Sequence, residues 1–156
     1  TCQAMCKRPC WGTPKDIQKL IDAGYSDRLN KDYWASNENG DVNIIGPALK
    51  GYEGKQAAFF PESEEGCTFY KNGLCELHNL GLKPSEGKLV SCQPETRDKE
   101  VTIHELVAQT WNTDEGRQIA SQWCEKMSVS QEFQFGGVED LVGALQLLEK
   151  ATEKGL

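Results

Sequence analysis

The sequence lacks any long apolar stretch, and basic residues are not in excess. No run approaches the ~20 apolar residues that a membrane-spanning helix needs, and the N-terminal segment has neither the charged nor the apolar region of a secretory signal. The 24 acidic residues outnumber the 17 basic ones, which gives a formal net charge of −7. Because nucleic-acid binding depends mainly on Lys and Arg that neutralise phosphates, a nucleic acid is not expected as a partner. We therefore expect a cytoplasmic protein that binds neither membranes nor nucleic acids.

Several common catalytic motifs are absent as well. The stretch GPALKGYEGK is rich in glycine, but Gly51 is followed by Tyr52 rather than by the lysine of a phosphate-binding P-loop. HELVA begins like a zinc-protease helix, yet there is no second histidine four residues after His104. No Gly-x-Ser-x-Gly elbow is present. Whether the protein is an enzyme therefore stays open.

The composition is that of one globular domain. Of the 156 residues, 38% are hydrophobic and 26% are charged, and the length fits a single domain over residues 1–156. A chain of this length can bury roughly 68–70% of its unfolded surface without covalent cross-links. Stability alone therefore does not require disulfide bonds.

The cysteines are the most informative residues that the chain does have. Their number is seven, and seven thiols cannot all pair within one chain. In a protein without an export signal, we expect reduced thiols that hold a metal rather than a disulfide framework. The cysteines form an N-terminal group, a central pair and two single positions: Cys2, Cys6 and Cys10; Cys67 and Cys75; Cys92; and Cys124.

The N-terminal group leads into a predicted helix. In residues 12–24, Thr13 can cap the helix and Pro14 suits its first position. Pro9 prevents any earlier helix from continuing. We therefore expect Cys10 to lie on a loop that enters this helix.

A β-hairpin is predicted at Asn72-Gly73, a strong signal for a two-residue turn. In an ideal hairpin Cys67 and Cys75 would be three places, or roughly 10 Å, out of register and on opposite faces. They can share one ion only if the strand bulges or ends before Cys67, and Gly66 makes such a bend easy. Counted outward from the turn, the expected pairs are Lys71 with Leu74, Tyr70 with Cys75 and Cys67 with His78.

The remaining pattern completes an α+β fold, in which covering helices pack on a small central hairpin or sheet organised around a cysteine metal site. Cys124 lies among apolar residues at helical spacing, so we expect a buried free thiol there and not a ligand. The other expected elements are a turn and short strand in 37–46, a hairpin in 46–60, and helices in 101–112, 113–127 and 137–155.

Three stretches have the order and spacing of a known family. They are CKRPCWGTPKDIQKLIDAGY, PALKGYEGK and GCTFYKNGLCELHNLGLKP. The chain resembles the YkgJ-like cysteine-cluster family, which is described as a zinc- or iron-chelating domain. The family pattern usually has a doubled cysteine whose second place here is Trp11, and it often has a cysteine at the place of Gly87. The resemblance implies metal binding by cysteines and leaves the reaction open, because the family is defined by its cysteines.

A closed site needs four thiolates, which tetrahedral zinc and iron–sulfur clusters both commonly use. We choose the ligands that match the cysteine positions of the family. A mixed site with His78, which stands at Cys-x₂-His spacing from Cys75, stays open. The expected ligands are Cys6, Cys10, Cys67 and Cys75, with Cys2 as the first reserve and Cys92 as the second.

The spacing favours an iron–sulfur cluster slightly over zinc. The two-residue gap of a tight zinc knuckle is absent, and three-residue gaps in a loop also occur around iron–sulfur clusters. We expect a metal-binding accessory, electron-transfer or redox-sensing module. A small metalloenzyme and a non-catalytic structural zinc domain are the alternatives, and a protein partner stays open.

Overall fold

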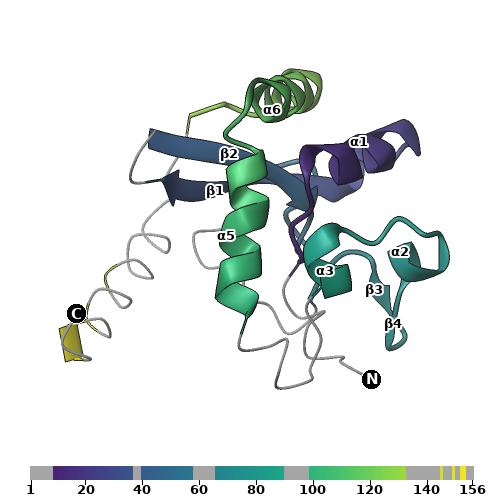
Figure 1. Cartoon of the computed structure of the whole chain (residues 1–156). Helices are drawn as coiled ribbons and strands as arrows, with labels where there is room; N and C mark the ends of the chain where they lie inside the picture. The colour runs from purple at the N-terminus through teal and green to yellow at the C-terminus, as the bar shows by residue number, and fades with distance from the viewer. Residues whose placement is uncertain are drawn as a thin grey trace.

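The computed structural model describes residues 9–36, 40–57, 66–89 and 99–132, together with positions 145, 149, 152 and 153. The described ranges form five α-helices and two small two-stranded antiparallel sheets (Figure 1). The predicted α+β class is therefore confirmed. Outside the described residues lie Cys2, Cys6, Cys92 and, apart from isolated positions, the helix predicted over 137–155.

Helix α1 (Pro14–Asp22) begins as the sequence predicts. The hydroxyl of Thr13 accepts a hydrogen bond from the backbone N–H of Asp16 (3.2 Å), and the carboxylate of Asp16 accepts one from the N–H of Thr13 (3.0 Å). This reciprocal capping box satisfies two N–H groups that a helix start leaves without partners. The face that carries Ile17 and Leu20 is fully buried. Helix α1 therefore starts at a fixed point, directly after the loop that carries Cys10.

The larger sheet pairs β1 (Leu29–Ser36) with β2 (Gly40–Pro47), from Leu29 opposite Pro47 to Ser36 opposite Gly40. Strand β2 confirms the strand predicted in residues 37–46. The sequence pattern does not predict β1, because the charged residues Lys31 and Asp32 are consecutive and obscure the alternation of polar and apolar positions.

The hairpin predicted in residues 46–60 does not form in its described part, 46–57. The chain instead turns at Gly51, whose φ of +97° is easily adopted only by glycine, and returns beside β1. There the N–H of Lys31 donates to the carbonyl of Lys55 (3.0 Å), and the N–H of Ala57 donates to the carbonyl of Lys31 (2.8 Å). Strand β1 is thus hydrogen-bonded along both edges.

Helices α5 (Glu100–Thr110) and α6 (Asp114–Met127) confirm two of the predicted helices. Helix α6 contacts β2, and Figure 1 shows it along one side of the larger sheet. Two buried indoles join these helices to the N-terminal half: Nε1 of Trp111 donates to the carbonyl of Gly12 (2.8 Å), and Nε1 of Trp123 donates to that of Ser26 (2.9 Å). No helix in the described ranges is both long and apolar enough to cross a membrane.

A fully buried lysine fastens the chain after α6 to the larger sheet. Nζ of Lys31 donates to the carbonyls of Ser130 (2.7 Å) and Glu132 (2.9 Å). On β2, the side-chain amide of Asn43 donates to the carbonyl of Gln131 (2.7 Å). Burial lowers the pKa of Lys31. Three consecutive carbonyls are therefore held by two side chains of one sheet.

Candidate functional site

Cys10 lies where the sequence predicts, on the loop that enters α1. Its side chain is half-buried, and the buried indole of Trp11 follows it. The backbone after Cys10 is held in place, since the carbonyl of Trp11 accepts a hydrogen bond from the N–H of Glu86 (3.1 Å). The capped start of α1 and this bond from α3 (Ser85–Leu89) together position the Cys10 thiol.

The small hairpin of β3 (Tyr70–Lys71) and β4 (Leu74–Cys75) has the predicted register. Tyr70 pairs with Cys75 and Lys71 pairs with Leu74. Both turn residues, Asn72 and Gly73, have positive φ values of 52° and 78°, as a two-residue type I′ turn requires. The turn chemistry of the sequence thus places Cys75 at the end of β4.

Cys67 lies outside this ladder, so the expected pair with His78 does not form. Strand β3 begins only at Tyr70, and α2 (Glu76–Asn79) begins directly after Cys75. Cys67 instead forms an isolated bridge with Leu49, after a bend at Gly66 where φ is +75°. The strand therefore ends before Cys67. This is the condition stated above under which Cys67 and Cys75 can share one ion.

The structure brings Cys10, Cys67 and Cys75 into one electrostatic neighbourhood. Burial raises the pKa of the Cys10 thiol, and the negative charges of Cys67, Glu86 and Cys75 raise it further. The ammonium of Lys83 opposes this rise. For Cys67 and Cys75 to act on Cys10 in this way they must lie near it, although more than fifty positions separate Cys10 from the other two in the sequence.

The thiols are near one another without forming a complete ligand set. Within the four described ranges, no three or more His, Cys, Asp or Glu side chains are grouped closely enough to hold a metal ion. Cys10, Cys75 and Cys124 are free thiols. Of the four expected ligands, Cys6 lies outside the described residues, and so do both reserves, Cys2 and Cys92.

The two remaining candidates are placed away from this group. Cys124 is buried in α6 beside Trp123, within the apolar core, as its sequence neighbours predict. Burial raises the pKa of Cys124, and the nearby ammonium of Lys31 opposes that rise. His78 is exposed on α2. Neither side chain contributes to the neighbourhood of Cys10.

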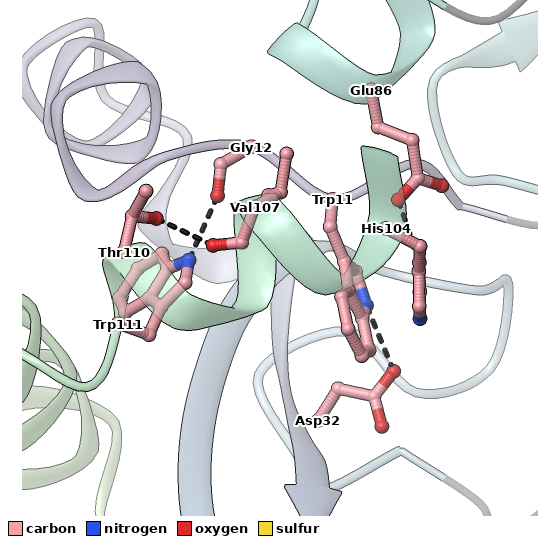
Figure 2. A network of polar contacts seen from close by, with 8 residues as sticks. All are labelled: Trp11, Gly12, Asp32, Glu86, His104, Val107, Thr110 and Trp111. Carbon is pink, nitrogen blue, oxygen red and sulfur yellow. Dashed lines mark hydrogen bonds and ion pairs between the residues drawn. The ribbon is translucent and has the colours of Figure 1, made fainter. Parts of the chain in front are cut away.

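A second polar arrangement, not expected from the sequence, surrounds Trp11 (Figure 2). Nε1 of Trp11 donates to Oδ2 of Asp32 (3.1 Å), and the indole stacks on the imidazole of His104 with ring centroids 3.7 Å apart. Nδ1 of His104 lies 2.7 Å from Oε2 of the buried Glu86. These four residues, which we call the His104 cluster, come from the N-terminal loop, β1, α3 and α5. Each contact joins segments that are distant in the sequence, so no local sequence pattern predicts it.

Comparison with protein-family models, with curated proteins and with solved structures yields no match for this chain. The function is therefore argued below from the residues of this chain and from the proposed family resemblance.

Proposed function

We propose that the protein binds a metal through cysteine thiolates from the N-terminal loop and the central hairpin, as an iron–sulfur cluster or as zinc. The observation that carries the proposal is that Cys67 and Cys75 both act electrostatically on the Cys10 thiol. Thiolates are the shared ligands of structural zinc sites and iron–sulfur clusters. A bound cation would also offset the mutual repulsion that the three thiolates otherwise exert.

The fourth ligand in this proposal is Cys6, with Cys2 as reserve. Both stand within eight residues of Cys10 on the same N-terminal stretch. Binding must draw the three described thiols closer together and close the site with this fourth thiolate. His78 is not part of the proposed set, because it lies exposed on α2.

Position 87 supports the proposed resemblance to the YkgJ-like family. A Cβ built on Gly87 would lie 2.9 Å from Sγ of Cys10. The family often has a cysteine at this place, and a cysteine here would stand directly beside the Cys10 thiol. The position at which this chain differs from the family pattern, Gly87, thus lies next to a proposed ligand. Without a cysteine at position 87, the fourth ligand has to come from the N-terminal cysteines.

In this proposal the protein is a cytoplasmic accessory, electron-transfer or redox-sensing module. Iron–sulfur is favoured slightly over zinc by the three-residue gaps between the N-terminal cysteines. A non-catalytic zinc-binding interaction domain and a small metalloenzyme are the alternatives. The metal would stabilise the fold in every case, because binding energy in a site of this kind is partly folding energy.

The test is an elemental analysis with an absorption spectrum of protein purified without oxygen. Iron with acid-labile sulfide and broad visible absorbance would support the cluster, and zinc without colour would support the alternative. Cys10→Ser and Cys75→Ser should each lose the metal, whereas the matched control Cys124→Ala should retain it. Stoichiometric metal in both serine variants, or none in the parent protein, would contradict the proposal.

A further inference from the structure

We propose that the His104 cluster is an acid–base site, in which Nε2 of His104 takes a proton from a water molecule that attacks a small ester or similarly activated acyl compound. The inference does not depend on metal binding. It rests on how the imidazole of His104 is oriented, how far it is exposed and which charges surround it.

The imidazole is fixed from two directions. Oε2 of Glu86 lies 2.7 Å from Nδ1 of His104, and the Glu86 side chain is only 8% exposed. The indole of Trp11 lies against one face of the ring, at an interplanar angle of 21°. A carboxylate that accepts the proton of Nδ1 leaves the lone pair on Nε2. The ring is therefore held in the tautomer and the orientation of a base.

The second ring nitrogen, Nε2, belongs to a side chain that is partly exposed. The His104 side chain is 37% exposed, and Figure 2 shows its second ring nitrogen at the end remote from Glu86. Within the described part of the chain, Nε2 has no hydrogen-bond partner.

Two carboxyl groups from other elements lie around the imidazole of His104. Glu86 faces the ring from α3, and Asp32 lies on β1 beyond Trp11. Burial raises the pKa of Asp32, and the negative charge of Glu86 raises it further, while hydrogen bonds from Tyr33 and Trp11 and the positive charge of His104 oppose that rise. Asp32 and His104 therefore interact electrostatically, and the carboxylate of Glu86 lies beside the positive charge that develops on the ring.

The proposed step needs no co-reactant besides water. One O–H bond of the water breaks, its proton passes to Nε2, and the oxygen forms a bond to the acyl carbon. The C–O bond to the leaving group then breaks, and the alkoxide takes the proton from Nε2. The products are an acid and an alcohol, and His104 returns to its starting state. A positioned base of this kind contributes typically about 10²–10⁴-fold to a rate.

The probe is p-nitrophenyl acetate at near-neutral pH, with the intact protein. Thiols would be acetylated once, in a stoichiometric burst, so the steady release of nitrophenolate after the burst measures the base. His104→Gln should lower this steady rate about tenfold or more, whereas His78→Gln should change it less than about twofold. His78 is the matched control because it is the other histidine of the chain and is exposed.

A second measurement is independent of turnover. Nitrogen-15 NMR of the wild-type imidazoles should show His104 with its proton on Nδ1. In Glu86→Gln the amide can donate to Nδ1, so the proton should move to Nε2 and the steady rate should fall with it. Equal rates in the two histidine variants, a wild-type rate no faster than free imidazole at the same concentration, or an Nε2–H tautomer in the wild type would overturn the proposal.

Discussion

The carboxylate of Asp16 accepts a hydrogen bond from the backbone N–H of Ser85 at 3.0 Å, although 69 positions separate the two residues. The same Oδ2 also accepts the N–H of Thr13 in the capping box of α1 and the hydroxyl of Ser85. One carboxylate thus joins the starts of α1 and α3, on either side of the loop that carries Cys10.

Asp16→Ala should therefore lower the free energy of unfolding by about 1–2 kcal/mol, as the loss of a good N-cap does. Burial alone would raise the pKa of Asp16, but the hydrogen bonds from Ser85 and Thr13 outweigh it and hold the pKa below its usual value. The carboxylate is thus stabilising above the unfolded pKa near 3.8, and this contribution is lost as the pH falls through the lower folded pKa. Urea unfolding of the wild type and of Asp16→Ala across pH 2–6 would measure this contribution, with Asp27→Asn, at an exposed position, as the control. A difference in the free energy of unfolding that stays the same down to the lowest pH would contradict the prediction.

Of the two cations that pair with Glu76, Arg28 should stabilise the protein more than Lys71 does. Its guanidinium donates to Oε2 of Glu76 (3.0 Å) and to the carbonyl of Thr68 (2.9 Å), and it lies 4.1 Å from the centroid of the Phe69 ring. Arg28→Lys loses this planar geometry and should destabilise the protein by about 1–2 kcal/mol. The matched control is Lys71→Gln, which removes a more exposed ion pair with Glu76 and should cost less than about 1 kcal/mol. Thermal or urea unfolding would rank them, and a larger effect at Lys71 would refute the assignment.

Gly87→Ala should affect the Cys10 thiol more than it affects stability. The new Cβ would lie 2.9 Å from both Sγ of Cys10 and Cε of Lys83, and both are side-chain atoms that can move aside. The gain in helix propensity, up to about 1 kcal/mol, offsets part of the contact, so stability should change by less than about 1 kcal/mol. The proposed metal content should nevertheless fall because Sγ is displaced.

Gly46→Ala is the control for this variant. Its Cβ would lie at an ordinary distance, 3.8 Å from Cδ1 of Trp11 and 3.9 Å from the carbonyl of Cys10. Metal content should therefore be unchanged. Equal metal content in the two variants, measured by elemental analysis, would show that the thiol beside Gly87 is not a ligand.

The redox state of the thiols provides a further check. Protein unfolded in chelator should show seven free thiols without prior reduction, because the expected ligands are thiolates that the chelator releases from the metal. Native protein with its metal should react at few of them. A count of one that rises to seven on reduction would instead indicate a disulfide framework and overturn the cytoplasmic expectation.

The parts of the fold that can be predicted from the sequence are those determined by neighbouring residues, such as helix caps and tight turns. Thr13 and Pro14 define the start of α1, and Asn72-Gly73 defines the turn and register of the small hairpin, because each signal acts within a few residues. Strand β1 is not predicted, since the buried Lys31 finds its partners about a hundred positions away.

The same distinction applies to the candidate sites. The resemblance to a family is what selects the expected ligands, whereas the end of the strand before Cys67 accompanies its bridge to Leu49, which no local pattern reveals. The His104 cluster is not predicted at all. Glu86, for example, is a charged residue that is nevertheless buried, and its carboxylate contacts His104, which lies 18 positions away in the sequence.

The buried ammonium of Lys31 also discriminates against wrong structures. A one-residue slip of β1 against β2 would turn every side chain of the strand to the opposite face. Lys31 would then lose the carbonyls of Ser130 and Glu132, and Asp32 would lose the indole of Trp11, leaving polar groups without partners in the interior. A buried charge of this kind adds little net stability to the correct pairing but penalises the alternatives strongly. Lys31 thus favours a single register of β1 against β2 over its alternatives. That register also helps to fix the positions of both candidate sites.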